Sequence, residues 1–185
     1  MLVAAKKDDK IMVGVSVCDS LIDMTEKDLS LIENLPFWKV NGTNDCYVFA
    51  DERNFAVELL RYNDHIFKNI TDGNSIITTV VPKMKELLSK YLQVVDGKQW
   101  EGPLLIVKGN NMYSIGNFFT VTEVKEFVGF GYESYLLGSL YESKDKDLTE
   151  SILFAVENLN FALSKNFFPL MVFDNQTKRR KFYYR

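Results

Sequence analysis

Histidine and cysteine are scarce in this sequence, which limits its catalytic and metal-binding chemistry. The one histidine, His65, would have to serve in any Ser-His-Asp triad, and a histidine-rich metal site is excluded. His65 follows Asp64 in a helix-like stretch, and we interpret it as a surface or half-buried helix residue. Cys18 and Cys46 lie in apolar, strand-like runs, so we expect two reduced core residues in a cytoplasmic protein.

Carboxylates that could bind a metal ion occur in short clusters along the chain. Each cluster lies in a predicted turn or at a predicted helix start, where carboxylates cap helices and face water. We therefore predict no metal site, and we expect no other cofactor. The clusters are Asp8-Asp9, Asp45, Asp51-Glu52 and Asp145-Lys146-Asp147.

The composition is that of an ordinary globular protein. Of 185 residues, 46% are hydrophobic and 25% are charged, and this length predicts a single domain over residues 1–185. The net charge is −3 and the sequence has no strongly basic stripe, so nucleic acid is not an expected partner. No apolar run approaches the roughly 20 residues of a membrane helix, and the charges at 6–10 interrupt any secretory signal. We expect no membrane partner.

Basic and aromatic residues are interleaved near the C-terminus. Such a pattern can hold single-stranded nucleic acid, but it is more often a final strand with its turn. We favour the strand, because the rest of the chain is acidic overall. The residues are Lys178, Arg179, Arg180, Lys181 and Arg185, with Phe182, Tyr183 and Tyr184 among them.

Pairs of short apolar runs joined by turn residues predict four β-hairpins. A further short strand is predicted at 126–131, where it runs into small residues. The hairpins pair 2–5 with 11–15, 36–40 with 46–50, 103–107 with 112–115, and 169–173 with 181–184.

Apolar residues at helical spacing predict helices between these hairpins. The first spans about 51–68 and is broken by the turn residues at 71–74. The second begins or kinks near Pro82 and ends at 96–97. The third follows from Tyr132 to about Tyr141, and the fourth starts after an N-cap at Asp147. The segment 19–34 shows only the weak start of a short helix.

Hairpins and helix pairs therefore alternate along the chain. Single strands alternating with single helices would indicate a Rossmann sheet, and this order argues against one. Two antiparallel sheets, each with a helix pair on its outer face, would bury every apolar stripe. The predicted fold class is α+β, a four-layer α-β-β-α sandwich.

This element order, at this length, resembles the proteasome β-subunit and the related bacterial proteasome-like peptidase, which are N-terminal-nucleophile hydrolases. The hairpin at 2–14 is similar to the family's opening hairpin, and 102–107 with 113–115 is similar to its central one. The string 128–131 before a helix is similar to the family's Gly-Ser-Gly turn, and 147–150 to the start of its last helix. The resemblance covers nearly the whole chain and implies the same sandwich.

The resemblance also implies a Thr, Ser or Cys as residue one, whose side chain attacks an amide carbonyl while its α-amine serves as the base. Aligning the strands puts that position at or just before Met1, whose thioether has no proton to give up. The family's Asp near the end of the second strand is matched by Ser16, or by Asp19 if the register slips. Its Lys at the start of the third strand is matched by Pro36, with Lys39 three residues later.

At the family's remaining catalytic positions, the residues of this sequence also differ from the family's pattern. Tyr47 is the residue nearest to the oxyanion-hole Gly, and Phe130 replaces the Ser of the small-residue turn. The family's late Asp falls near Lys165 or Asn166. These departures together predict that the site is lost, with Tyr47 and Phe130 filling the cleft, and no catalytic residue is predicted.

The sequence thus favours a non-catalytic, proteasome-like subunit with a structural or interaction role, whether or not its cleft still binds a peptide. The alternative is an active N-terminal-nucleophile peptidase or amidase with a different mature N-terminus. Removal of a propeptide would expose Ser16 or Cys18, and a start codon further upstream could supply a Thr or Cys.

Aromatic residues are concentrated in one part of the sequence, and we expect some of them to be exposed unless a partner covers them. This predicts an oligomer, either a dimer or a ring of identical or related subunits, assembled through the helix pairs or this aromatic region. The residues are Phe118, Phe119, Phe127, Phe130, Tyr132, Tyr135 and Tyr141.

Overall fold

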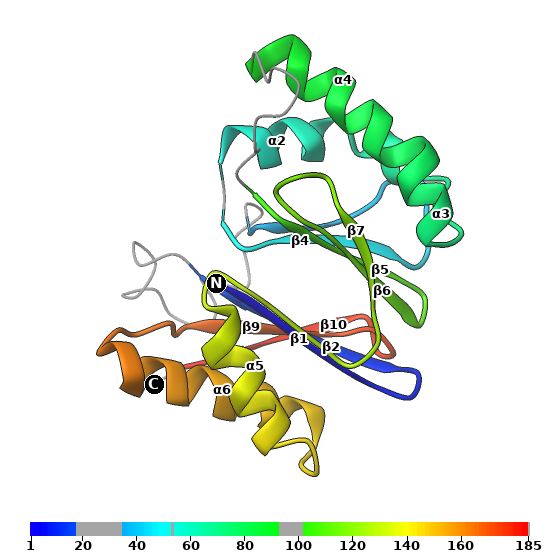
Figure 1. The fold of residues 1–185 in the computed structure, drawn as a ribbon. Coiled ribbons are helices and arrows are strands. Elements are labelled where there is room, and N and C mark those ends of the chain that lie inside the picture. The colour runs from blue at the N-terminus through cyan, green and yellow to red at the C-terminus, as the bar shows by residue number, and fades with distance from the viewer. Residues whose placement is uncertain (18–34, 53, 93–101, 185) are drawn as a thin grey trace. The chain divides into compact units, whose positions relative to one another are not determined.

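The computed structural model describes residues 1–17, 35–52, 54–92 and 102–184 (Figure 1). Backbone contacts group the chain into two compact units, each built on one antiparallel sheet. Unit 1 comprises Met1–Leu35 with Lys125–Arg185, and unit 2 comprises Pro36–Val124. The expectation of one domain over residues 1–185 stays a prediction.

Unit 1 contains a five-stranded sheet in which the first hairpin is central. Every neighbouring pair of strands in it is antiparallel. In their order across the sheet, the strands are β10 (Arg179–Tyr183), β9 (Leu170–Asp174), β2 (Lys10–Ser16), β1 (Leu2–Lys7) and β8 (Phe127–Phe130).

Both faces of strand β1 are buried. Val3 and Ala5 belong to the core that the strand shares with the helices of unit 1, and the alternate residues Leu2 and Ala4 are also fully buried. A strand with one solvated face would alternate apolar and polar residues, whereas a strand buried on both faces is apolar throughout. This burial explains the continuous apolar run at the start of the sequence.

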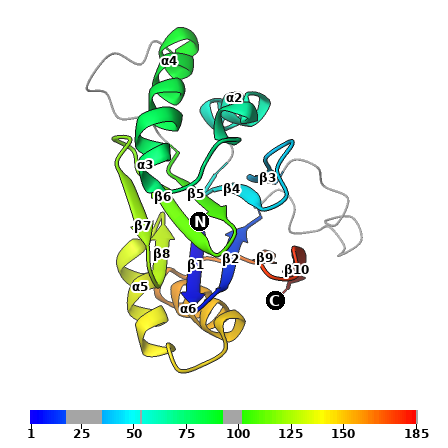
Figure 2. The same cartoon turned by 90° about the vertical axis from the view of Figure 1, so that its right-hand side faces the viewer.

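Two helices, α5 (Glu133–Glu142) and α6 (Leu148–Leu163), cover one face of the unit 1 sheet (Figures 1 and 2). The helix α6 packs closely on β2 at Gly14. A Cβ added to Gly14 would lie only 2.8 Å from Cγ2 of Ile152, so this position has no room for a larger residue. Asp147 caps α6, with Oδ1 accepting a hydrogen bond from the Thr149 backbone N–H at 2.8 Å. The predicted N-cap is therefore confirmed.

Replacing Asp147 by alanine is expected to lower the free energy of unfolding by about 1 kcal/mol at neutral pH. The hydrogen bond from Thr149, with a smaller effect of Lys10, holds the pKa of the Asp147 carboxyl below its usual value. The stabilisation is thus present above the unfolded-state pKa and is lost as the pH falls through the lower folded-state pKa. Urea unfolding at neutral pH and below about pH 3 should show the deficit shrinking in acid, and a constant deficit would contradict this account.

Unit 2 contains the second five-stranded sheet, in which the strands follow one another in chain order. It confirms the second and third predicted hairpins and adds an edge strand that the sequence pattern did not predict. The strands are β3 (Phe37–Lys39), β4 (Cys46–Ala50), β5 (Leu104–Lys108), β6 (Asn111–Ile115) and β7 (Val121–Val124). Strand β7 was not predicted because its exposed residues, Thr122 and Glu123, leave little apolar pattern.

The first predicted helix of unit 2 is divided in the structure. Helix α2 (Phe55–Tyr62) starts at the N-cap Asn54 and ends at Asn63, and the 3₁₀ helix η2 (Asp64–Phe67) follows. Nδ2 of Asn63 donates to the Leu59 carbonyl at 2.8 Å. A side chain that competes in this way for a helix carbonyl favours a helix end, so one continuous helix over 51–68 was wrong.

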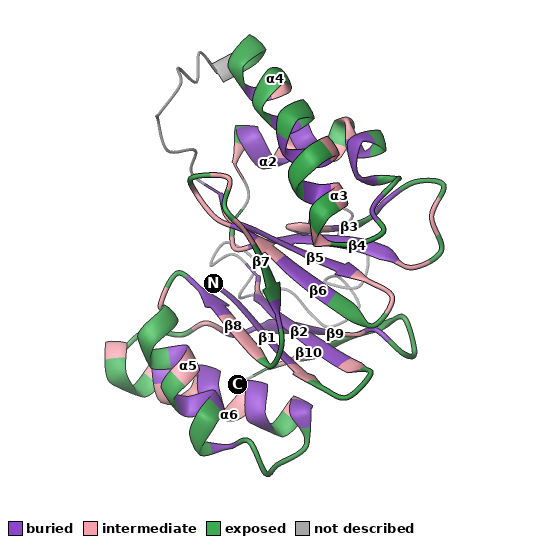
Figure 3. Cartoon of the chain, turned by 45° about the vertical axis from the view of Figure 1, so that its right-hand side comes forward, coloured by how far each residue is buried: buried purple, intermediate pink, exposed green. Residues whose placement is uncertain are grey.

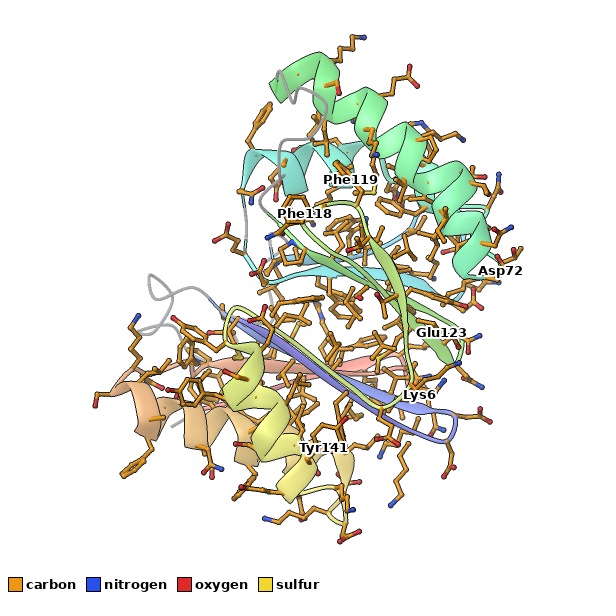
Figure 4. The ribbon with its side chains drawn as sticks, in the orientation of Figure 1. Lys6, Asp72, Phe118, Phe119, Glu123 and Tyr141 are labelled. Carbon is orange, nitrogen blue, oxygen red and sulfur yellow. The ribbon has the colours of Figure 1, made fainter. Side chains whose placement is uncertain are left out.

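The second predicted helix begins earlier than the sequence indicated. The predicted turn at 71–74 contains the start of a helix, because Asp72 and Ser75 form a capping box that begins α3 (Gly73–Ser75). Figure 4 labels Asp72 at this helix start. A π turn, η3 (Ile76–Val80), leads directly into α4 (Val81–Leu92). Pro82 lies in the first turn of α4, as predicted. In a regular α-helix the Pro82 ring would clash with the backbone carbonyl four residues earlier, and the wider π turn at that point relieves the clash.

The helices of unit 2 pack on one face of their sheet and form its main core (Figure 1). The outward surfaces of the helices in both units are exposed, whereas the central strands are buried (Figure 3). Some predictions lie outside the described residues, namely Cys18, the weak helix start within 19–34, and the end of the second helix at 96–97.

Candidate functional site

The head of strand β1 is where the resemblance places the nucleophile, and the structure brings several predicted residues together there. The Met1 carbonyl accepts a hydrogen bond from the Ser16 backbone N–H at 3.0 Å. Gly131, after β8, has a φ of +93°, and a Cβ added to it would lie 3.8 Å from the Met1 Cα. The small-residue turn thus approaches the first residue of the strand, and its positive φ favours glycine.

Ser16 lies beside Met1 but its hydroxyl is engaged elsewhere. Oγ donates a hydrogen bond to the Phe167 carbonyl at 2.8 Å. The only hydroxyl proton of this side chain is therefore directed at the backbone of the segment before β9. A carboxylate at this position, as the resemblance implies for an active enzyme, could not donate such a bond at neutral pH.

Phe130 occupies the position of the family's turn serine. It pairs with Leu2 in the register of β1 and β8, and its ring is buried. A buried phenyl ring can neither accept nor donate a proton, so the position supplies hydrophobic packing only.

The position of the family's late Asp falls in the segment between α6 and β9. Lys165 is exposed there. Oδ1 of Asn166 accepts from the Phe168 backbone N–H at 3.0 Å, and Oδ1 of Asn160 accepts from the Phe167 N–H at 3.0 Å. Both amides therefore stabilise the turn that leads to Pro169.

Unit 2 holds the two other predicted positions, Pro36 and Tyr47. The Pro36 carbonyl accepts from the Ala50 N–H at 2.8 Å, which extends the ladder of β3 and β4 by one pair. Tyr47 is buried, and its ring stacks on Phe37 at a centroid distance of 5.9 Å. Burial, and then the nearby Asp45 carboxylate, raise the pKa of the Tyr47 phenol. Lys39 pairs with Tyr47 in register and is exposed.

Two surface clefts in unit 1 lie at the opposite end of β1 from Met1. Their volumes are about 560 and 420 Å³, and both include Lys7, Asp8 and Asp145. Strand β1 has six residues, which at about 3.3 Å each separates these clefts from Met1 by the full strand length. The larger cleft is lined by charges of both signs and lies away from the position that the resemblance assigns to the nucleophile.

Cys46 is a free, buried thiol on β4. Burial raises the pKa of the Cys46 thiol to about 12. We expect its alkylation by iodoacetamide at about pH 8 to be at least about 100-fold slower in the native protein than in strong denaturant. Mass mapping of the Cys46 peptide would measure both rates, and equal rates would contradict the buried position.

The remaining candidate groups do not form a second site. His65 is exposed on η2, as the interpretation of a surface residue requires. In the part of the chain that the structure describes, no three His, Cys, Asp or Glu side chains are placed to hold a metal ion. Among these residues, no helix has both the length and the apolar character needed to cross a membrane.

Comparison with known proteins identifies the fold. The protein named BPH from Thiobacillus denitrificans, solved in complex with epoxomicin, aligns with a TM-score of 0.70 and 15% identity, covering 94% of this chain and 96% of that one. Anbu from Hyphomicrobium sp. strain MC1 aligns with a TM-score of 0.60 and 12% identity, over 98% of this chain and 86% of that one. HslV from Trypanosoma brucei aligns with a TM-score of 0.56 and 11% identity, covering 94% of this chain and 97% of that one.

No family model and no curated protein matches the sequence. At these identities the structural likeness shows the fold, which is the α+β sandwich of the proteasome-like N-terminal-nucleophile hydrolases. The fold class predicted from the order of hairpins and helix pairs is confirmed.

Proposed function

We propose that this chain is a non-catalytic, proteasome-like subunit with a structural or interaction role. One observation carries the proposal: the residue at the head of β1 is Met1, and the hydroxyl beside it, that of Ser16, donates to the Phe167 carbonyl. The thioether of Met1 cannot attack a carbonyl and release a proton. Ser16 lies within the chain, so it has no free α-amine that could act as the base for its own hydroxyl.

The other positions support the same proposal from chemistry. An active site of this type needs a cation to lower the nucleophile's pKa and donors for the oxyanion. Pro36 supplies no charge, Lys39 is exposed on β3, and Tyr47 and Phe130 are bulky buried side chains. The free thiol of Cys46 supports a reducing compartment, and we propose the cytoplasm.

The test is the intact mass of the untagged protein purified from its own host, before and after incubation with epoxomicin. We expect no Thr, Ser or Cys at the mature N-terminus and no increase in mass with the compound. A terminal Thr, Ser or Cys, or a gain of the mass of epoxomicin, would overturn the proposal. Either result would instead favour the active peptidase or amidase.

We also propose that the subunit forms a homo-oligomer or assembles with related subunits. The aromatic residues expected to crowd one region are divided between the units, because Phe118 and Phe119 lie at the β6–β7 turn of unit 2 (Figure 4). Three large aromatic side chains on the outer helices of unit 1 are nevertheless exposed: Phe161 at 91%, Tyr141 at 56% and Tyr135 at 53%. Exposed rings of this size are typical of an interface.

If α5 and α6 form that interface, Phe161→Glu should shift the assembly towards a monomer of 21.4 kDa. The expected loss of affinity is at least about tenfold, because a carboxylate would be buried without a partner. Light scattering after size exclusion measures the mass, and Tyr62→Glu, an exposed site on α2, is the matched control. A protein that is monomeric before any substitution would contradict the assembly itself.

A further inference from the structure

Strand β10 forms one edge of the unit 1 sheet, next to β9 (Figure 2). An edge strand presents a row of backbone N–H and C=O groups that can pair with a further strand. Among the described residues, only β9 pairs with β10. This edge therefore has the backbone geometry needed to accept an extended chain.

The exposed side chains of this edge are almost all cationic. Lys178, Arg179, Arg180 and Lys181 are consecutive and all exposed. Without these four the chain has 18 basic against 25 acidic residues, a net charge of −7. Positive charge is thus concentrated on one short segment of an otherwise acidic protein, which favours an acidic partner there.

The register shows how the cations are distributed over the two faces of the strand. Lys181 pairs with Val172, which packs against the helices of unit 1, so Arg179 and Lys181 lie on the helix side. Arg180 lies on the other side, with Phe182. Residues two apart are separated by about 6.6 Å, which is also the spacing of side chains on one face of an extended peptide.

The guanidinium groups are available for recognition of carboxylates. Among the described residues, the side chains of Arg179 and Arg180 have neither a hydrogen-bond nor an ion-pair partner. Arginine offers a planar pair of donors that matches a carboxylate in a bidentate arrangement.

Two other occupants fit the edge less well. A second copy of β10 would place like charges opposite one another, which disfavours pairing. Single-stranded nucleic acid stacks successive bases on several exposed rings. Here Phe182 is only 7% exposed and Tyr183 packs against the unit 1 core, with Nζ of Lys181 5.0 Å from its ring centroid, which leaves Tyr184, at 39%, as the one exposed ring of the three.

We propose that β10 binds an acidic, extended segment of a partner protein, which joins the unit 1 sheet as an added strand with carboxylates at alternate positions. Backbone hydrogen bonds supply the pairing, Arg179 and Lys181 bind the carboxylates on the helix side of the added strand, and Arg180 adds positive charge on the other side. This surface does not involve Met1, so the binding test and the test of lost catalysis can fail independently.

The experiment is fluorescence anisotropy of the full-length protein with a labelled peptide of about eight residues that alternates Glu and Thr. We expect saturable binding at about 50 mM salt that weakens as salt is added. The variant Arg179→Glu/Arg180→Glu/Lys181→Glu should lose at least about tenfold in affinity. The matched control is Lys83→Glu/Lys85→Glu/Lys90→Glu, which makes the same charge change on the exposed surface of α4 and should stay within about twofold.

Two N-methylated peptides test the strand pairing without altering the protein. One is methylated at odd positions and the other at even positions, so each removes the N–H donors from one edge of the peptide. We expect one isomer to lose binding and the other to retain it. Equal binding of both isomers, equal binding of the β10 variant, or tighter binding of an oligodeoxythymidine than of the peptide would each overturn the proposal.

Discussion

Asn175→Ala is expected to lower the free energy of unfolding by about 3 kcal/mol. The Asn175 side chain is 1% exposed and joins the β9–β10 turn to the first hairpin. Its Oδ1 accepts from the Ile11 backbone N–H at 2.7 Å, and its Nδ2 donates to the Asp9 carbonyl at 3.1 Å. Alanine would leave the donor of fully buried Ile11 without this acceptor, and that desolvation dominates the cost.

Urea unfolding followed by circular dichroism measures the effect, with Gln176→Ala as the control. Gln176 is the exposed next residue of the same turn, so its truncation should change the stability by less than about 0.5 kcal/mol. Asn175→Asp keeps an acceptor for Ile11 but cannot donate to the Asp9 carbonyl while ionised. Burial raises the pKa of such a carboxyl, so the loss of stability in Asn175→Asp should be larger at neutral pH than near pH 4. Equal stability of the alanine variant and the original protein would contradict this account.

Asn175 illustrates which contacts a sequence reveals. The turn itself was predicted, and Oδ1 of Asp174 accepts from the N–H groups of Gln176 and Thr177, as turn residues of this type do. The partner of Asn175 is more than 160 positions away in the chain, at Ile11. Local turn chemistry is encoded in neighbouring residues, whereas this contact depends on strand order in the sheet.

The strands and their pairing were largely predictable because burial on both faces leaves continuous apolar runs. The errors arose where one side chain redirected the backbone. Asn63 ended α2 through its bond to Leu59, and Asp72 started a helix where turn residues suggested only a break. Asn, Asp and Ser favour helix ends and turns alike, so composition alone does not distinguish the two.

The candidate site was predictable only in its residue types. Met1, Ser16 and Phe130 were selected by resemblance, and the structure places Ser16 beside Met1 and Phe130 opposite Leu2. The bond from Ser16 to the Phe167 carbonyl was not foreseen, because it joins residues 151 positions apart. The cationic edge at β10 was recognised as a strand, but its position at the edge of the sheet follows only from the topology.

Phe67→Ala in unit 2 is expected to have the largest effect of the substitutions considered, a loss of about 3–5 kcal/mol in the free energy of unfolding. Phe67 is fully buried on η2, and its ring meets that of Trp38 edge-on at a centroid distance of 6.2 Å. The Phe67 side chain thereby links the helical layer of unit 2 to its edge strand β3. Alanine would remove the transfer free energy of the ring and leave a cavity between fixed elements.

Phe55→Ala is the matched control, because this phenylalanine begins α2 in the same unit but is 62% exposed. Its truncation should change the stability by less than about 0.5 kcal/mol, whereas Phe67→Ala should lower the melting temperature by roughly 10 °C. Loss of the ring contact should also change the near-ultraviolet circular dichroism of Trp38. Equal melting temperatures for the two variants would show that η2 does not anchor the helices on this sheet, and the pairing of β3 with β4 would then have to stabilise that edge alone.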